Sequence, residues 1–592
     1  MSKAPTLAAA THDGGRRRLL KGLATVPLAG LGVPAVVAQD SGPDTEWAME
    51  ADVVIVGSGI AGTSAALAAA QQGVTVLMLE KMPFQGGTTA KSAGVFWIPD
   101  NPILRAQGVK DERLDTLRYM VRLAQPTLFR ADHPTLGIAA DDFELLGTFV
   151  DHARRVVEAL MAQSALRIMP WLYAENAVWP DYYGDIPENK VERGRSIVCD
   201  VKAYPERHFW AGGGGAGTSL LWQLQQGFEN RPIKVLLDHA VTAVTRNGTG
   251  EVTGVVVDNG DPKPLHVRAH KAVIFASGGY THNVAMADSF LRGKIWGGCA
   301  APGSTGDFVG IAAGLGAPLG NMNNAWWAQV AVEVALKTRS VPFNVWSTPG
   351  DSVIQVNRYG LRFGNEKIAY NERAQLHFVW DPVKLEYPNL LGFMIWDART
   401  AQAYAGYDPI PGKDARQAHV VQAATLPELV RQLEARLVAI ADHTGGLELA
   451  PDFLANLRQS VQRFNQAARQ GKDSEFHRGE TPNEQAWQFV GLQPVDNPYP
   501  NPALHPIADS GPYYAVILGA GTLDTKGGPR VNPKGQVLDA QGAPIAGLYG
   551  AGNCVASPAA QAYWGGGGTI GPAMTYGYLC GEAAAAERPK RA

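Results

Sequence analysis

The chain has 592 residues, of which 46% are hydrophobic and 18% are charged, and its formal net charge is −3. This is the composition of an ordinary globular protein, with enough length for two or three domains. The near-neutral charge gives no reason to expect nucleic acid or an acidic membrane surface as a partner. The four cysteines are scattered and form no C-x-x-C pair, so the sequence predicts neither a metal site nor a disulfide framework.

Residues 1–38 have the layout of an export signal. Three arginines, residues 16–18, precede a mildly apolar stretch over residues 22–37, and Ala38 is expected to be the last residue removed. This order is typical of a twin-arginine signal, whose pathway carries folded, cofactor-loaded proteins; a disordered basic tail is the alternative. We therefore expect a periplasmic protein, and we find no second apolar stretch long enough to act as an integral membrane anchor.

The stretch from Ala51 to Lys81 has the order of a dinucleotide-binding βαβ unit. Its parts are a buried strand, three glycines in G-x-G-x-x-G spacing, a helix, a second strand and an acid: Val53–Val56, Gly57, Gly59, Gly62, Thr63–Gln72, Val74–Leu79 and Glu80. The glycines permit the tight turn, the approach of a pyrophosphate and the close packing of the helix. The helix N-terminus offers free N–H groups to the phosphates, and the acid can accept a hydrogen bond from a ribose hydroxyl. A chance glycine cluster in a loop is the alternative.

Segments suited to phosphate or flavin binding lie near both ends of the chain, and the middle differs in composition. We predict a first dinucleotide-binding part at residues 47–325, an inserted domain at 326–494 and a second dinucleotide-binding part at 495–588. A ligand in an open parallel sheet lies beyond the carboxyl ends of the strands. An inserted domain over that edge would enclose an active site between the domains.

Six segments together resemble the flavoprotein family of fumarate reductases and 3-ketosteroid Δ1-dehydrogenases, over nearly all of residues 50–586. They are Gly57-x-Gly59-x-x-Gly62 with Glu80, Gly86–Thr89, Ala276–Gly279, Arg362–Glu366, Thr525–Pro529 and Gly550–Asn553. The resemblance implies an α/β fold, with a Rossmann-like FAD-binding domain split in sequence and an inserted α+β catalytic domain. It also implies non-covalent FAD, because the covalent members carry a histidine near Gly86 and this chain has none there.

The resemblance further implies which residues contact FAD. They belong to the glycine motifs, to the segment after the second strand and to the start of the last helix. The expected contacts are Gly57, Gly59, Ile60, Ala61, Gly62, Glu80, Lys81, Gly87, Thr88, Thr89, Ser92, Gly94, Ala240, Val241, Ala276, Ser277, Gly278, Gly552, Asn553, Gly568, Thr569 and Ile570.

Two segments separate the branches of this family. Fumarate reductases usually bear histidines near Gly527 and after Asn553, and this chain has none there. Residues 563–572 are instead similar to the ketosteroid dehydrogenase signature, which implies α,β-desaturation of a cyclic ketone with hydride transfer to flavin N5. Trp564 stands where that branch usually has proline. With Trp97 and Trp327 as further expected pocket residues, it favours a cyclohexanone-type ring over a 3-ketosteroid.

The same resemblance assigns catalytic roles. The Tyr563 hydroxyl and the Gly567 N–H are expected to bind the carbonyl oxygen, and Tyr370 is expected to take the α proton. A free tyrosine has a pKa of about 10, so the base needs a lowered pKa or a relay. The relay partner is expected among Tyr182, Tyr183 and, less favoured, Tyr173. For each tyrosine, packing with a satisfied hydroxyl is the alternative.

Two other functions stay open from the sequence. One is the reverse chemistry, a flavin enone reductase or fumarate-type reductase. The other is an exported flavin electron carrier. For a dehydrogenase, we expect the external electron acceptor to be a quinone or a periplasmic carrier, because no nicotinamide site is visible. Neither the oligomeric state nor the ring size follows from the sequence.

Overall fold

The computed structural model describes residues 39–40, 45–174, 177–201, 216–488 and 495–590. These residues belong to one compact unit, residues 37–592. The predicted export signal lies outside the described residues. Within the described part of the chain, no helix has the length and apolar character needed to cross a membrane.

The larger of the two main sheets is built on parallel strands. β2 (Met49–Val56) lies between β3 (Val76–Leu79) and β12 (Leu265–Phe275), and all three run parallel. β9 (Ile233–Leu236) extends the sheet beyond β3, and β21 (Pro544–Gly550) pairs with β12. Their near-continuous apolar runs are typical of strands covered on both faces. The α/β class predicted from the sequence is confirmed.

An antiparallel extension completes this sheet. β10 (Ala240–Arg246) pairs with β11 (Val252–Asp258), which pairs with β12. Two short strands, β1 (Gln39–Asp40) and β20 (Gln536–Leu538), add to β10 and β21. Residues 233–246 therefore form two strands of this sheet, because β9 joins its parallel part and β10 its antiparallel part.

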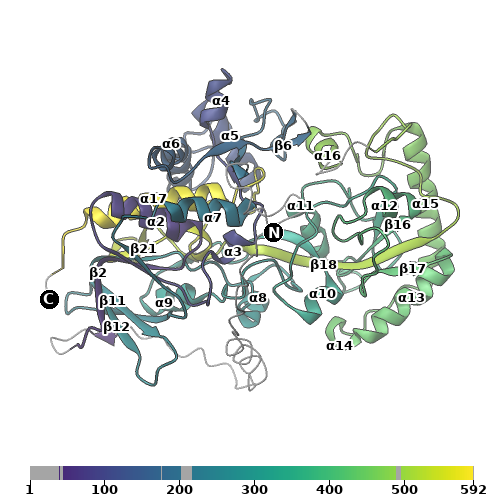
Figure 1. Ribbon diagram of the computed structural model, residues 1–592. Helices are drawn as coiled ribbons and strands as arrows, with labels where there is room; N and C mark the ends of the chain where they lie inside the picture. Colours follow the sequence, from purple (N-terminus) through teal and green to yellow (C-terminus); the bar gives the residue numbers. More distant parts are fainter. Residues whose placement is uncertain (1–38, 41–44, 175–176, 202–215, 489–494, 591–592) are drawn as a thin grey trace, which may run out of the picture. The chain divides into compact units, whose positions relative to one another are not determined.

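Three helices lie over the parallel strands (Figure 1): α2 (Ile60–Gln71), α7 (Ala216–Gln226) and α17 (Ile570–Ala586). α2 packs directly on α17. Every residue of α2 except Gln71 is buried, which explains why this alanine-rich helix has no polar face. It begins three residues before the predicted start, because Gly59 is its N-cap.

The second main sheet is antiparallel. β18 (Tyr513–Thr525) pairs with β14 (Ala325–Ala331), β16 (Gly392–Asp397) and β17 (Val421–Ala423), and β16 pairs with β15 (Val353–Val356). β18 therefore lies in the segment predicted as the second FAD-binding part but pairs with strands of the segment predicted as inserted. The domain boundaries stay predictions.

Helices cover the outer side of the second sheet. α13 (Leu426–Ala439) packs on β17 and β18, and α15 (Phe453–Gln470) packs on β15 (Figure 1). α11 (Tyr370–Gln375) packs on β14 and β18, which places its first residue at the inner side of this sheet.

The remaining elements connect these layers or form small sheets. They are α3 (Gly87–Ala90), β4 (Val95–Trp97), α4 (Pro102–Ala106), α5 (Arg113–Ala124), α6 (Ala140–Ala162), β5 (Ile168–Pro170), β6 (Leu172–Ala174), β7 (Ala177–Val178), β8 (Ser196–Cys199), α8 (Val284–Phe290), α9 (Asp307–Gly314), β13 (Leu319–Gly320), α10 (Val332–Lys337), η3 (Leu376–Phe378), α12 (Ala398–Ala403), α14 (Ala441–Thr444), α16 (Pro482–Trp487), β19 (Gly528–Pro529) and η4 (Gly552–Cys554).

Candidate active site

A cavity of about 740 Å³ lies beyond the carboxyl ends of the parallel strands. Its wall begins at Gly57 after β2 and Ala276 after β12, and it extends to Asn344 and Tyr370 beside the second sheet. This position is where open α/β sheets bind ligands. The cavity is within the size range of cofactor and substrate sites.

Most of the residues predicted to contact FAD line this cavity. They are Gly57, Gly59, Ile60, Ala61, Glu80, Lys81, Gly87, Thr88, Thr89, Ser92, Val241, Ala276, Ser277, Gly278, Gly552, Asn553, Thr569 and Ile570. Four others do not line it: Gly62, Gly94, Ala240 and Gly568. A Cβ at Gly62 would lie 2.0 Å from the Gly57 carbonyl oxygen, so this glycine serves helix packing.

The residues at this end of the cavity suit a dinucleotide. The Glu80 carboxylate is held by the Ser58 N–H at 3.0 Å and the Met82 N–H at 2.9 Å, and it lines the wall. The N-terminus of α2 opens onto the cavity at Ile60, and that of α17 opens onto it at Ile570. Free N–H groups at two helix N-termini favour negatively charged groups such as a pyrophosphate. The wall therefore fits FAD.

Replacing Gly59 with alanine is expected to weaken FAD binding without unfolding the protein. A Cβ at Gly59 would meet protein no closer than 3.6 Å, at the Thr89 side chain, so the fold accommodates the methyl group. The methyl group would instead obstruct the approach of a pyrophosphate to the backbone, and a lost hydrogen bond to a charged group costs roughly 10- to 100-fold in affinity. Titration of the apoprotein with FAD measures the effect. Gly310→Ala, in an open position on α9, is the control and should bind FAD normally.

Three tyrosines gather in one part of the cavity wall. The rings of Tyr182 and Tyr370 lie 5.5 and 5.3 Å from that of Tyr563. The Tyr182 hydroxyl donates a hydrogen bond of 2.8 Å to the Tyr370 hydroxyl. All three line the cavity and are at most 4% exposed. The predicted carbonyl-binding tyrosine and the predicted base thus share one surface.

The other two candidates for the relay lie elsewhere. Tyr183 is hydrogen-bonded to Glu372, a buried residue of α11. Tyr173, in β6, packs edge-on against Trp179 at 5.4 Å. Tyr182 and Tyr183 therefore bond to two residues of the same helix, Tyr370 and Glu372, and together fix α11 to the loop that precedes β8.

Burial raises the pKa of all three clustered tyrosines. For Tyr370, the neighbouring Tyr182 and Tyr563 add to this effect, and its pKa lies well above 10.0. For Tyr563, burial raises the pKa, although Thr569, Tyr370 and the Gly567 N–H act in the opposite direction. Each phenol is therefore protonated near neutrality. A protonated phenol suits a hydrogen-bond donor, whereas a base at this position depends on a relay.

Gly567 lies beside Tyr563 in the same wall. Its φ is +85°, and a Cβ would lie 2.4 Å from the Phe96 Cα, so only glycine fits. Its carbonyl accepts hydrogen bonds from the N–H groups of Trp97 and Gly571, which fixes the peptide. Its own N–H lies close enough to the Tyr563 hydroxyl to lower the pKa of that phenol. Two donors therefore converge where one carbonyl oxygen would be bound.

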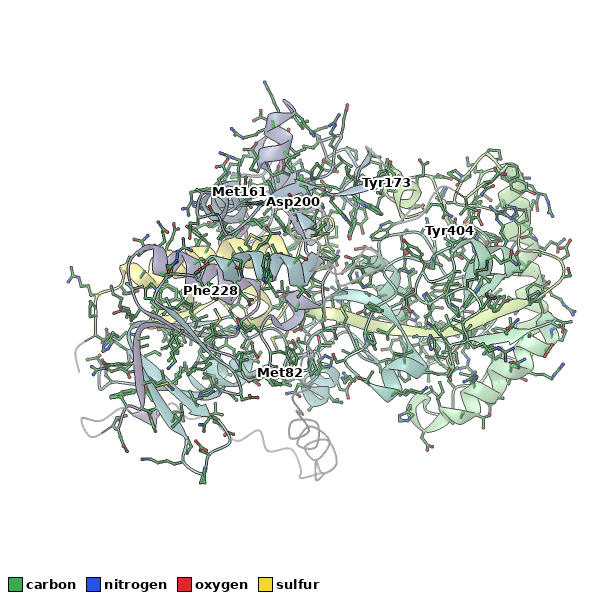
Figure 2. The ribbon with its side chains drawn as sticks, viewed as in Figure 1. Met82, Met161, Tyr173, Asp200, Phe228 and Tyr404 are labelled. Atoms are coloured by element: carbon green, nitrogen blue, oxygen red, sulfur yellow. The ribbon has the colours of Figure 1, made fainter. Side chains whose placement is uncertain are left out.

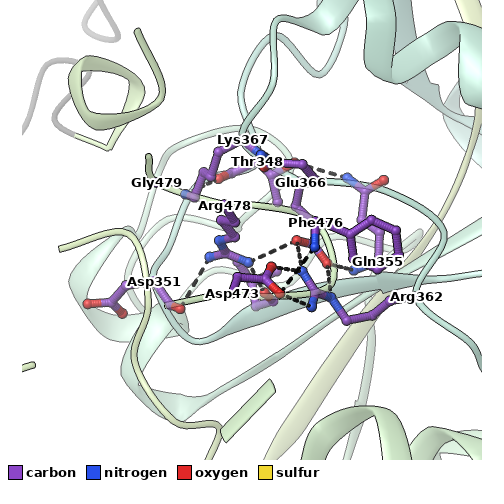
Figure 3. A network of polar contacts seen from close by, with 12 residues as sticks. Thr348, Asp351, Gln355, Arg362, Glu366, Lys367, Asp473, Phe476, Arg478 and Gly479 are labelled. Atoms are coloured by element: carbon purple, nitrogen blue, oxygen red, sulfur yellow. Dashed lines mark hydrogen bonds and ion pairs between the residues drawn. The ribbon is translucent and has the colours of Figure 1, made fainter. Parts of the chain in front are cut away.

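A buried ionic network holds the segment that leads to Tyr370 (Figure 3). The Arg362 guanidinium contacts Glu366 and Asp473, each at 2.8 Å, and Arg478 contacts Glu366 at 3.2 Å. These side chains are at most 1% exposed. The Lys367 Nζ donates to the carbonyls of residues 348 and 350, each at 2.6 Å. Glu366 and Asp473 therefore hold Arg362 in place.

Replacing Asp473 with asparagine is expected to lower the free energy of unfolding by about 3 kcal/mol at pH 7, because one partner of a buried ion pair loses its charge. Burial alone would raise the pKa of Asp473, but the Arg362 guanidinium outweighs burial and lowers it. A lowered folded-state pKa stabilises the fold above the ordinary carboxyl pKa of 3.8, and this contribution is lost as the pH falls below it.

Denaturant unfolding between pH 7 and pH 3 measures this effect. The difference between wild type and Asp473→Asn should shrink as the pH falls. A difference that stays constant over this range would contradict the assignment. Glu434→Gln, on the exposed face of α13, is the control and should unfold like the wild type.

Lys526 is a positioning residue that sequence reasoning missed. Its Nζ donates to the carbonyls of Ala560 at 3.1 Å and Ala562 at 2.6 Å, directly before Tyr563. It also lies 3.9 Å from the ring centroid of Trp326, which contacts the Tyr563 ring at 5.0 Å. Burial lowers its pKa well below 10.5. Its position within the Thr525–Pro529 motif was the feature of the sequence that could have identified it.

The three tryptophans predicted for the substrate pocket lie in the packed interior instead. Trp97 and Trp564 contact each other at 5.5 Å, and Trp327 packs on Phe378 at 4.9 Å. None of the three is among the described residues that line the cavity. The side chains in the wall are other aromatic residues: Trp171, Trp179, Phe343, Trp346, Tyr407 and Trp487. The aromatic-rich stretch 171–183 was the available signal for two of them.

In the described part of the chain, no three histidine, cysteine, aspartate or glutamate side chains come together to hold a metal ion. The four cysteines are free and buried. Cys299 lines the cavity, and burial raises the pKa of its thiol to about 12.

Comparisons with known proteins agree with this geometry. Residues 52–570 match the family described as FAD binding domain. A 4-oxocyclohexanecarboxylate 2-dehydrogenase of Sinomonas cyclohexanicum is 30% identical over 90% of this chain and 93% of its own length. A 3-oxosteroid 1-dehydrogenase of Mycolicibacterium smegmatis is 32% identical over 90% of this chain and 96% of its own.

A solved structure extends the comparison to three dimensions. It is the 3-ketosteroid Δ1-dehydrogenase of Sterolibacterium denitrificans in complex with 1,4-androstadiene-3,17-dione. It matches with a TM-score of 0.75 and 25% identity, over 91% of this chain and 99% of that chain.

Proposed function

The chain belongs to the FAD binding domain family, and we propose that it uses its cofactor, FAD, to desaturate a cyclic ketone at the carbons α and β to the carbonyl. The FAD is held non-covalently. Relatives that share about 30% of their residues with this chain are dehydrogenases of cyclic ketones and 3-oxosteroids. The observation that carries the proposal is the convergence of Tyr563, Gly567 and the Tyr182–Tyr370 pair on one end of the cavity.

Different residues of the site carry out different parts of the proposed reaction. The Tyr563 hydroxyl and the Gly567 N–H bind the ketone oxygen, which makes the α proton acidic by stabilising the enolate-like charge. Tyr370 takes the α proton as a phenolate and becomes a neutral phenol, and the 2.8 Å hydrogen bond that the Tyr182 hydroxyl donates stabilises the phenolate before the transfer. Bound FAD supplies the hydride acceptor. Because burial raises the pKa of Tyr370, little of this phenol is ionised near neutrality, and proton removal should become faster as the pH rises.

The walls favour a rigid alicyclic substrate. Trp179 contacts Trp171 at 4.7 Å and Trp487 at 4.8 Å, and Trp487 contacts Tyr370 at 6.0 Å. Flat aromatic surfaces of this kind bind saturated rings by apolar contact. We propose a cyclohexanone-type ring or a 3-ketosteroid as the substrate.

Anaerobic mixing of the oxidised enzyme with a panel of cyclic ketones that keep a saturated α,β bond, from cyclohexanone to androstenedione, tests the proposal. At least one ketone should bleach the flavin absorbance and yield one enone per flavin. The reverse chemistry predicts instead that the reduced enzyme is reoxidised by fumarate or another α,β-unsaturated acid and that no ketone bleaches it. An electron carrier would respond to neither.

The cellular setting is a further part of the proposal. The arginines at residues 16–18 support export by the twin-arginine pathway, and a periplasmic enzyme would pass its electrons to a quinone or a periplasmic carrier. Substituting these arginines with lysine should retain the protein in the cytoplasmic fraction. Periplasmic accumulation of that variant would exclude this route.

A further inference from the structure

The opening of the cavity carries a carboxylate to which the proposed reaction gives no role. Asp408 lies in the loop after α12 and lines the cavity together with Gly406 and Tyr407. Asp408 and Gly406 are exposed, whereas Tyr563 and Tyr370 are each 4% exposed. We call the exposed part of the wall, which includes Asp408, the mouth, and the buried part, which includes the tyrosines, the inner end.

A second segment reaches the mouth from another part of the chain. Leu172, in β6, lines the cavity and is 38% exposed. Tyr173 in β6 and Tyr404 at the end of α12, both labelled in Figure 2, mark the segments that carry Leu172 and Asp408 into the wall. Trp487 contacts Tyr370, and Trp179 contacts Trp487. Trp171, which precedes Leu172 in the sequence, contacts Trp179 in turn. The wall between the two ends is therefore largely aromatic.

The charge of Asp408 is not balanced by the described residues of the wall. They give it no hydrogen bond or ion pair, and their cationic members are Lys81 and His239. Lys81 pairs with Asp307 at 2.6 Å, and the His239 Nδ1 lies 2.6 Å from the carbonyl oxygen of Leu237. Partial removal of water around the Asp408 carboxyl raises its pKa to about 6, so it is mostly ionised at neutral pH.

We propose that Asp408 selects the substrate by the group at the end remote from the ketone: it accepts a hydrogen bond from a hydroxyl or ammonium group and excludes a carboxylate. A substrate whose ketone lies between Tyr563 and Gly567 extends along the aromatic wall toward the mouth. The carboxylate there is a hydrogen-bond acceptor with a negative charge, so it attracts a donor and repels an anion. This inference rests on the proposed function and names the substrate class within it.

The test compares ketones that differ only in the remote group. The probes are 4-hydroxy-, 4-methyl- and 4-carboxycyclohexanone, together with 3-ketosteroids that carry a hydroxyl, keto or carboxyl group at carbon 17. Wild type, Asp408→Asn and Asp408→Ala are compared by kcat/KM for flavin reduction. Asp509→Asn, an exposed aspartate outside the cavity wall, is the matched control.

In Asp408→Asn, kcat/KM for the carboxyl probe should rise roughly 10- to 100-fold, because a like-charge contact is removed. The methyl or keto probe should change less than about 3-fold, since neither carries a charge. Asp408→Ala should also admit the carboxyl probe and lose the preference for the hydroxyl probe. If ketones reduce the flavin but both variants keep the wild-type ratio of carboxyl to methyl or keto probe, this inference is wrong and the proposed function stands. If no ketone reduces the flavin, both fail.

Discussion

Tyr563→Phe is expected to slow reduction of the flavin by a cyclic ketone roughly 100- to 1000-fold, the usual cost of removing one donor from an oxyanion site. The variant loses only a hydroxyl that accepts a long hydrogen bond of 3.4 Å from Thr569, so the fold and the bound FAD should be retained. Stopped-flow absorbance under anaerobic conditions measures the rate, and the flavin spectrum confirms the loading.

A matched variant separates this effect from the general loss of a buried phenol. Tyr549 is buried, and its hydroxyl donates to Glu587 outside the cavity. Tyr549→Phe should therefore reduce its flavin at the wild-type rate. Equal rates in Tyr563→Phe and wild type would show that Tyr563 does not bind the carbonyl oxygen, and would favour the alternative function of a flavin electron carrier.

Tyr370→Phe is expected to lower the same rate by about 100- to 10,000-fold, the range for loss of a positioned general base. Burial raises the pKa of Tyr370 well above 10.0, so the wild-type rate should rise with pH and still be rising at pH 10. In Tyr370→Phe this pH dependence should disappear while the affinity for ketone is retained. Stopped-flow rates from pH 6 to pH 10 give both quantities.

The neighbouring tyrosine provides the control. Tyr182→Phe removes the group that bonds to Tyr370 but leaves the base, so its rate should lie between those of wild type and Tyr370→Phe. Tyr183→Phe, whose hydroxyl bonds to Glu372, should affect the rate less than Tyr182→Phe does. A reversed order of these two variants would assign the relay to Tyr183.

The cofactor half of the site could be predicted from the sequence because its signals are local. The βαβ unit from β2 to β3 places its glycines and Glu80 within about thirty residues of one another, and the spacing itself dictates the turn and the helix start. The fold class, the family and FAD follow from that unit and from five further motifs. All three are confirmed by the relatives and by the solved structure.

The substrate half could not be predicted to the same depth, because it depends on packing between distant segments. Trp171 and Trp487 are separated by more than 300 positions and reach one wall only through the tertiary fold. Trp97 and Trp564, which flank recognised motifs, are enclosed instead by other aromatic residues such as Phe149. Composition and spacing carry no information on which side of a wall an indole lies.

The choice between Tyr182 and Tyr183 illustrates the same limit. Adjacent residues in an irregular segment point in different directions, and the sequence does not indicate which one faces the base. The structure pairs Tyr182 with Tyr370 and Tyr183 with Glu372. The domain boundary near residue 495 is a similar case, because β18 pairs with β14 and β16 across a long sequence separation.

The rate of anaerobic flavin bleaching by a saturated cyclic ketone deuterated at the β carbon tests the central claim most directly. The account predicts bleaching with one enone formed per flavin, a slower rate for the β-deuterated ketone than for the unlabelled one, and a collapse of both rates in Tyr563→Phe. Flavin that stays oxidised with every ketone, in an enzyme whose reduced form is reoxidised by an α,β-unsaturated acid, would contradict it.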